Sequence, residues 1–331
     1  MKFSVLDQAP ISRGSTPKET LENSIQLAKL VETLGYTRYW VAEHHNTNGL
    51  ASSAPEILIA RLAAETNKIR IGSGGVLLPQ YAPLKVAEMF NMLEALYPNR
   101  IDLGIGRSPG GSSTTRLALT DRLKKNLSLF PVQLEELYGF LFNDLASDHE
   151  FRTIKASPRI DTHPEMWVLG LSERGAINAA NIGAGFTFGH FINPENGQKA
   201  IEKYRYKFKP SLNLEKPKVN VCVFVVCAET EKKAGELAIS QDKWLLNVKN
   251  GGDTKISSSS EINKTSLSKE ELDQIKENRK RAIVGTPDGV KKELEELSKK
   301  YGGVDEFLII TNIFDFKEKC NSYKLLAKVL S

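Results

Sequence analysis

Strands and helices alternate along this chain of 331 residues, and the alternation predicts an α/β fold, specifically a (β/α)8 or TIM barrel. Eight apolar segments of strand length are separated by segments with helical periodicity. Polar or glycine-rich residues directly follow most of these strands, as they do at the rim where barrel sites form. A barrel of this type takes about 250 residues, so a single domain over residues 1–331 has room for insertions.

The first half of the chain supplies four of the strands and three helices. Residues 16–19, Thr-Pro-Lys-Glu, are a capping box with proline at the first helical position, and Gly35 ends the helix that they begin. Residues 53–56 begin a second helix, and Pro83 begins a third. The predicted strands are residues 5–7, 39–42, 69–72 and 101–105.

The second half repeats this pattern. We predict helices around residues 176–180, 195–207 and 290–299, and strands at 166–169, 186–188, 219–226 and 307–310. Two connections are longer than a barrel needs. We therefore expect insertions at about 107–164, after the fourth strand, and at 249–268, after the seventh. The second contains Gly-Gly and four consecutive serines, so it is either a mobile lid or a solvated surface loop.

Composition and charge exclude several classes of protein. Apolar residues make up 40% of the chain and charged residues 26%, which is typical of a soluble globular protein. The net charge of +5 comes from cations scattered among 40 acids, which disfavours nucleic-acid binding. The longest apolar run, residues 221–228, is too short to cross a bilayer. No signal peptide precedes the first strand, and the three irregularly spaced cysteines favour a reducing cytoplasm.

A doubly wound dinucleotide-binding domain is the competing α/β fold. Residues 104–106, Gly-Ile-Gly, follow a strand, but the third glycine of G-x-G-x-x-G would fall at Pro109. Residues 183–185 begin a second candidate, which meets Phe188 at the same place. Because neither fingerprint is complete, we favour the barrel.

Residues 43–45, Glu-His-His, are the most informative segment of the chain. They follow the apolar strand 39–42 and hold two of the five histidines. The unperturbed pKa of histidine lies nearest neutrality, which suits proton transfer. In a barrel the strand ends converge on one rim, so separated segments build one site. The segments expected there are residues 7–8, 43–45, 73–75, 106–108, 170–172 and 189–190.

These segments resemble the bacterial luciferase-like flavin-dependent monooxygenases. The specific part of the resemblance is residues 43–45, 72–79 (Gly-Ser-Gly-Gly-Val-Leu-Leu-Pro) and 99–107 (Asn-Arg-Ile-Asp-Leu-Gly-Ile-Gly-Arg). It continues weakly through 170–172 and through 285–287 before the last helix. The resemblance implies a homodimeric barrel that binds reduced FMN at its C-terminal rim and uses it with O2 on a small organic substrate. Because no NAD fingerprint is present, we expect a separate NAD(P)H:flavin reductase to supply the reduced FMN.

The phosphate of FMN needs hydrogen-bond donors and positive charge. Arg107 can donate two hydrogen bonds to phosphate oxygens, although it could also be a surface charge. Ser172 and Gly175 lie where a helix begins, so backbone N–H groups favour an anion there, although Ser172 could be only an N-cap. The other residues that we assign to this cofactor site are Gly170, Leu171 and Gly189.

Gly74 and Gly75 have no Cβ and would let the backbone approach the flat ring of a flavin. The resemblance implies an unusual, sometimes cis, peptide near them; a plain tight turn is the alternative. His44 matches the functional histidine of the family and is our candidate for proton transfer. We expect Glu43 to orient or charge it, and His45 to point the other way.

Three other functions stay open. Some proteins of the superfamily use a deazaflavin and transfer hydride without oxygen. A flavin-binding protein without catalytic activity would retain the same phosphate contacts. A barrel metallohydrolase could use His44, His45 and His190, but adjacent strand residues point to opposite faces and do not easily share one ion. We therefore expect no metal site.

Overall fold

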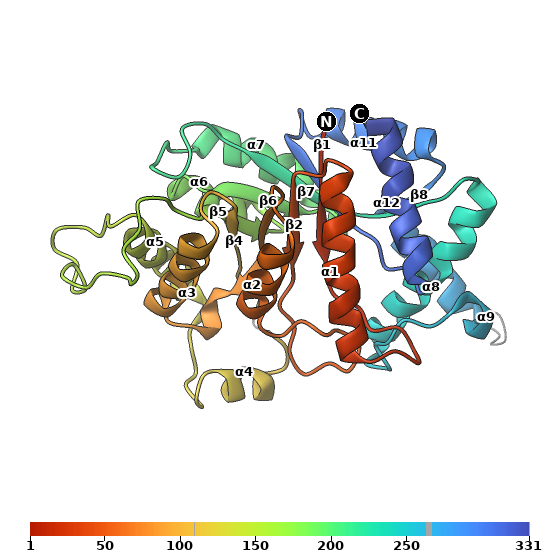
Figure 1. The fold of residues 1–331 in the computed structure, drawn as a ribbon, viewed down its shortest axis with the longest axis horizontal. Coiled ribbons are helices and arrows are strands. Elements are labelled where there is room, and N and C mark those ends of the chain that lie inside the picture. Colours follow the sequence, from red (N-terminus) through yellow and green to blue (C-terminus); the bar gives the residue numbers. More distant parts are fainter. Residues whose placement is uncertain (109, 263–266, 331) are drawn as a thin grey trace.

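The computed structural model describes residues 1–108, 110–262 and 267–330. Eight parallel strands close into a barrel with the helices outside it (Figure 1). The barrel closes because β9 pairs with both β1 and β7, and β7 pairs with β6. The predicted (β/α)8 barrel is confirmed. In order around the barrel, its strands are β1 (Lys2–Asp7), β2 (Arg38–Val41), β3 (Arg70–Leu77), β4 (Ile101–Gly106), β5 (Glu165–Gly170), β6 (Gly185–Gly189), β7 (Val219–Cys227) and β9 (Glu306–Ile310).

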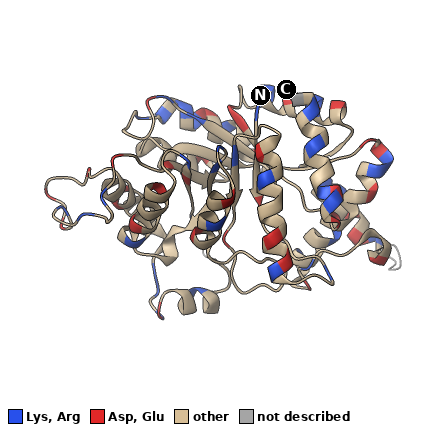
Figure 2. Ribbon diagram, viewed as in Figure 1, with Lys and Arg blue, Asp and Glu red and all other residues tan. Residues whose placement is uncertain are grey.

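The first helices begin where the capping signals predict. The side chain of Thr16 accepts from the N–H of Glu19, whose carboxylate accepts from the N–H of Thr16, at the start of α1 (Pro17–Thr33). Acidic and basic residues are interspersed over the outer helices (Figure 2). None of the helices in the described parts of the chain is long and apolar enough to span a membrane. The other large helices are α2 (Pro55–Glu65), α3 (Pro83–Leu96), α5 (Phe130–Leu141), α6 (Glu173–Asn181), α7 (Gly197–Lys207), α8 (Glu231–Asn250), α11 (Pro287–Lys300) and α12 (Phe316–Leu330).

A ninth strand, β8 (Ala282–Gly285), adds to the predicted eight and lies outside the barrel. It pairs with residues 224–227 of β7, beyond residues 219–222, which pair with β6. Its apolar run, Ala-Ile-Val-Gly, is only four residues long, is partly buried, and directly follows the basic residues 279–281, so it was not predicted as a strand. Residues 285–287 lie at the start of α11, whereas the last helix is α12. The expectation that the last helix follows these residues is therefore wrong.

The interior of the barrel is ionic at its N-terminal end. Nε of Arg38 lies 2.9 Å from Oε1 of Glu306, and its Nη1 lies 2.8 Å from Oδ2 of Asp102. Arg70 donates to the other oxygen of Asp102 over 2.7 Å, and Trp40 Nε1 donates to Oδ2 over 2.9 Å. Burial alone would raise the pKa of Asp102, but Arg38 and Arg70 hold it below its usual value.

The first insertion, residues 107–164, lies between β4 and β5. Besides α5 it contains α4 (Ser113–Leu119) and a 3-10 turn, η2 (Leu127–Leu129). No residue of α4 is buried, and Figure 1 shows this helix standing away from the barrel body. Pro109, which entered the argument against a dinucleotide fingerprint, lies outside the described residues.

The second insertion, residues 249–268, is partly packed against the barrel. Ile256 is fully buried in the apolar cluster inside the barrel, and its backbone bonds to Ile11 and Arg13. A Cβ on Gly49 would lie only 1.9 Å from the backbone oxygen of Thr254. A solvated loop is therefore the wrong description of the segment around Ile256. Residues 263–266 lie outside the described part of the chain, and the lid stays a prediction. Two helices, α9 (Ser259–Ile262) and α10 (Lys269–Arg279), flank that gap.

Candidate active site

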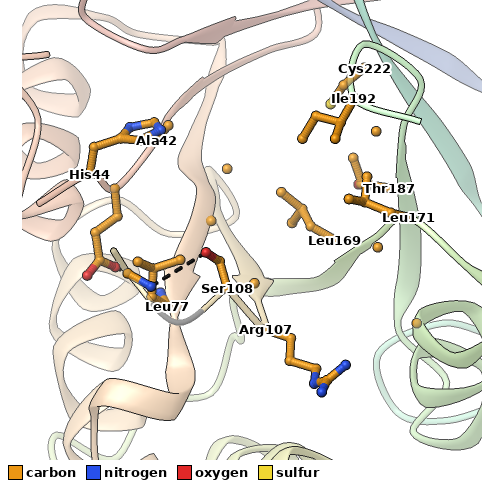
Figure 3. Close-up of a pocket in the computed structure, with 18 of the residues that line it drawn as sticks. Ala42, His44, Leu77, Arg107, Ser108, Leu169, Leu171, Thr187, Ile192 and Cys222 are labelled. Atoms are coloured by element: carbon orange, nitrogen blue, oxygen red, sulfur yellow. Dashed lines mark hydrogen bonds between the residues drawn. The ribbon is translucent and has the colours of Figure 1, made fainter. Parts of the chain in front are cut away.

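A cavity of about 690 Å³ opens among the C-terminal ends of the barrel strands. This volume is within the range of ordinary ligand pockets. Figure 3 shows side chains from β2, β3, β4, β5, β6 and β7, or from the loops after them, around this cavity. The separated segments thus converge as predicted, while the roles of their residues stay predictions. The predicted residues that line the cavity are Glu43, His44, Gly74, Gly75, Arg107, Gly170, Leu171, Ser172, Gly175 and Gly189.

His44 brings a neutral imidazole to the cavity. Its backbone N–H donates to the carbonyl of Ser52 over 3.0 Å, which holds the segment after β2 in place. Its Nδ1 is buried and has no partner among the described residues. Burial, and secondarily the neighbouring His45, lowers the pKa of His44 to about 4. At neutral pH this ring is therefore uncharged and keeps a nitrogen that can accept a proton.

Glu43 is bound to groups other than His44. Oε1 of Glu43 lies 2.7 Å from Nε2 of His45 and accepts from the hydroxyl of Tyr81 over 2.6 Å, while Oε2 accepts from the N–H of Leu77 over 2.8 Å. The expectation that Glu43 orients or charges His44 is therefore wrong. Glu43 and His45 therefore contact each other, and both of them line the cavity together with His44.

Gly74 and Gly75 lie inside β3, not beyond its end as expected, where the register with β4 shifts between Ser73 and Val76. The peptide between them is cis. A Cβ on Gly74 would lie 2.5 Å from the side chain of Leu6, and one on Gly75 would lie 2.6 Å from the backbone oxygen of Gly104. The backbone of Gly104 therefore requires glycine at position 75, whereas the contact at position 74 is with a flexible side chain, and both glycines line the cavity.

Groups that can donate hydrogen bonds to an anion line another part of the cavity. Arg107 is half-buried and makes no hydrogen bond or ion pair with another described residue. Ser172 is the N-cap of α6, but its hydroxyl does not cap the helix, so the first-turn N–H groups keep their donor capacity. The dipole of α6 adds partial positive charge at this end. These groups are suited to a phosphate.

Close contacts with neighbouring residues explain why three positions around the anion end of the cavity are glycines. A Cβ on Gly170 would lie 3.2 Å from Cα of Gly175, and one on Gly175 would lie 3.1 Å from Cα of Gly170. The end of β5 therefore touches the first turn of α6 directly. A Cβ on Gly189 would lie 2.6 Å from the side chain of Leu171. These three glycines hold the loops of β5 and β6 close together at the cavity.

Four polar residues that line the cavity were not predicted, namely Arg174, Asn178, Thr187 and Cys222. Arg174 and Asn178 lie four apart on α6, a helical spacing that was visible in the sequence once the helix had been assigned. Thr187 stands between two phenylalanines in β6, and this alternation indicates that it faces inward. A threonine between two aromatic residues of a predicted strand was thus the signal that could have identified this cavity residue.

The described residues contain no group of three or more His, Cys, Asp or Glu side chains that could hold a metal ion. His45 is bound to Glu43, and Nδ1 of His190 lies 2.8 Å from the hydroxyl of Tyr301. The three histidines considered for a metallohydrolase therefore do not form one ligand set in the described parts of the chain.

Comparison with known proteins identifies the family. The profile described as luciferase-like monooxygenase matches residues 1–306. The Bacillus subtilis (strain 168) protein YceB is 53% identical over 327 residues, which cover 99% of this chain and 98% of YceB. The N-acetyl-S-alkylcysteine monooxygenase of the same organism is 37% identical, with 99% and 97% covered. The crystal structure of apo-MsnO8 has a TM-score of 0.89 and 37% identity, covering 99% of this chain and 98% of that one. The chain belongs to the luciferase-like monooxygenase family.

Proposed function

We propose that this protein is an FMN-dependent monooxygenase that uses reduced flavin and O2 to oxygenate a small organic substrate. One observation carries the proposal: a single cavity joins an arginine that has no partner among the described residues, and a helix N-terminus, to a neutral imidazole. A separate NAD(P)H:flavin reductase supplies the reduced FMN, since neither glycine-rich segment completes a dinucleotide fingerprint. A deazaflavin is the alternative cofactor.

The residues at the anion end fit the phosphate of FMN. Arg107 would donate to the phosphate oxygens, and the N–H groups at the start of α6 would donate beside it. Arg174, in the first turn of the same helix, adds a second positive charge. Gly170 and Gly175 keep this part of the rim compact, so these donors stay in one place.

The residues at the other part fit a proton-transfer site beside a planar ring. Bound reduced FMN would supply the electrons that activate O2. His44 is neutral at pH 7 because its pKa is lowered to about 4, so it can take up a proton at the nitrogen that has no protein partner. Glu43 positions His45, with which it shares a hydrogen bond of 2.7 Å, and does not position His44. The backbone of Gly74 and Gly75 lines the same space.

The oligomer that we propose is a homodimer. Three large apolar side chains are exposed on the neighbouring helices α2 and α3: Ile57 (71% exposed), Met92 (58%) and Leu96 (63%). Exposed apolar side chains on adjacent helices form a candidate interaction surface. Sedimentation of the wild type should show a dimer, and Leu96→Asp should shift it towards a monomer. A monomeric wild type would contradict this part of the proposal.

Anaerobic titration with reduced FMN, followed by rapid mixing with O2, tests the proposed function. We expect saturable binding of reduced FMN, and oxidised FMN that appears with kinetics different from those of free reduced FMN. Oxidation at the rate of free reduced FMN would count against a monooxygenase. Binding of a reduced deazaflavin without oxygen consumption would replace FMN by the alternative cofactor. Flavin binding without any oxygen consumption would indicate a protein that only binds flavin.

A further inference from the structure

One wall of the cavity carries no charge. Figure 3 shows Leu169, Leu171, Thr187, Ile192 and Cys222 together across the cavity from His44. Burial raises the pKa of the Cys222 thiol well above its usual value, so the thiol stays protonated. Leu6 and Phe191 also line the cavity and belong to the same apolar cluster as Leu169 and Cys222.

Thr187 is the polar exception in this wall. Its side chain is 1% exposed, and Oγ1 has no hydrogen-bond partner among the described residues. A buried hydroxyl without a partner destabilises the fold, so buried hydroxyls are normally hydrogen-bonded. Thr311 shows the normal case, because it is also 1% exposed and donates to the carbonyl of Val225 over 2.9 Å. The two threonines are therefore equally buried, and they differ in whether the hydroxyl has a hydrogen-bond partner among the described residues.

We propose that Thr187 anchors the organic substrate by one hydrogen bond, and that the substrate is a neutral molecule whose buried end carries a single acceptor on a hydrocarbon or thioether frame. This inference rests on the proposed function, because it assigns the wall to the substrate and the anion end to FMN. The carbonyl of a ketone is the simplest such acceptor. Thr187 is then a residue that determines specificity.

The distribution of charge supports a neutral substrate. A charged group against the wall would lose its hydration without gaining an opposite charge, which is strongly unfavourable. The arginines that line the cavity, Arg107 and Arg174, belong to the anion end. Apolar contact with Leu6, Leu169 and Phe191 would supply most of the affinity, and the hydroxyl of Thr187 would fix the orientation.

Thr187→Val tests the anchor, because valine has nearly the same shape and no hydroxyl. Thr187→Ser keeps the hydroxyl, and Thr311→Val removes a buried hydroxyl that has a partner. FMN-loaded protein would be titrated with cyclohexanone and with methylenecyclohexane, in which a CH2 group replaces the carbonyl oxygen. We expect Thr187→Val to bind cyclohexanone about tenfold more weakly and methylenecyclohexane unchanged. Thr187→Ser should retain the preference for the ketone.

Thermal unfolding supplies a readout that does not depend on a ligand. Thr187→Val should unfold at the same temperature as the wild type or higher, since it removes a hydroxyl without a partner. Thr311→Val should unfold at a lower temperature. A clearly lower unfolding temperature for Thr187→Val would show that the hydroxyl stabilises the fold, and this would overturn the assignment.

The remaining outcomes separate this inference from the proposed function. Equal cyclohexanone affinity in the wild type and Thr187→Val overturns the anchor, as does a loss of FMN affinity in the variant, since Thr187 would then belong to the cofactor site. No binding of cyclohexanone to the FMN-loaded wild type, or tighter binding of the anion N-acetyl-S-methylcysteine, overturns the neutral substrate. If the wild type binds no flavin at all, the proposed function itself fails.

Discussion

The buried charged groups at the N-terminal end of the barrel are paired, whereas only some of the polar groups at the C-terminal rim are, Glu43 with His45 among them. At the N-terminal end, Arg38, Asp102 and Glu306 are buried and bound to one another. At the C-terminal rim, Arg107 has no ion pair in the described structure, and Nδ1 of His44 is buried without a partner. The amide of Asn220, which is buried and without a partner near the N-terminal end, is an exception to this contrast, and we have no physical account of it.

The contrast indicates which polar groups hold the fold and which are available to a ligand. A buried charge that is fully paired contributes to folding when its partners are present and destabilises the fold strongly when one is removed. A polar group that lacks a partner contributes little to the folded state and can bind something else. Local violations of good packing chemistry are expected at functional sites. The predictions below test this division.

Asp102→Asn should have the largest effect on stability. The substitution removes the negative charge between Arg38 and Arg70 and leaves both guanidinium groups undercompensated. We expect the free energy of unfolding, measured by urea denaturation, to fall by about 3–5 kcal/mol. Glu296→Gln is the control, because the Lys292–Glu296 pair is exposed with a separation of 4.0 Å; its effect should stay below about 0.5 kcal/mol. Similar effects of the two substitutions would contradict the division.

His44→Ala should do the reverse, with a small change in stability and a large change in turnover. A positioned imidazole contributes about 10²–10⁴-fold to proton transfer. We expect FMN affinity to be retained and turnover, measured as oxygen consumption with substrate, to fall at least about a hundredfold. Unchanged turnover would exclude the role that we assign to His44.

Arg107→Gln should weaken FMN binding without weakening the fold. Hydrogen bonds to a charged group contribute about 1.5–3 kcal/mol, which corresponds to a loss of roughly 10- to 150-fold in affinity. Riboflavin has no phosphate, so its affinity should not change, and this makes it the matched ligand control. The free energy of unfolding should stay within about 0.5 kcal/mol of the wild type. An equal loss of FMN and riboflavin affinity would place Arg107 away from the phosphate.

The barrel and the rim segments could be predicted because strand ends in a barrel converge whatever the details of packing. β8 could not, since its apolar run of four residues is short, partly buried and directly preceded by the basic residues 279–281. Gly74 and Gly75 were expected just past a strand end, as an unusual peptide or a tight turn, but they lie within β3, where the backbone of Gly104 requires glycine at position 75. The sequence of one strand does not show what an adjacent strand places beside it.

The partners of Glu43 show the same limit at the site. Tyr81 and Leu77 lie 38 and 34 residues away in the sequence, and only the fold brings them to the carboxylate. Thr187 was more accessible, because its place between two phenylalanines already indicated an inward side chain. What the sequence could not indicate is that the hydroxyl lacks a partner, since this depends on every neighbouring strand.

The smallest effect that we predict is the contribution of His44 to the pH dependence of stability. The pKa of His44 is lowered to about 4 in the folded protein, against an ordinary value of about 6.5. The unfolded chain therefore binds more protons between these values, so the contribution of the neutral ring is present above pH 6.5 and is lost as the pH falls towards 4. Because His44 is only half-buried, we expect a loss on the order of 1 kcal/mol. The pKa of Asp102 is below its ordinary value despite burial, so Asp102 stays ionised over this range, whereas burial raises the pKa of Glu306, so the Arg38–Glu306 pair weakens as the pH falls in both proteins. Urea unfolding at pH 7 and pH 4.5 should thus show a smaller difference for His44→Ala than for the wild type. The same difference in both proteins would mean that other groups carry the pH dependence.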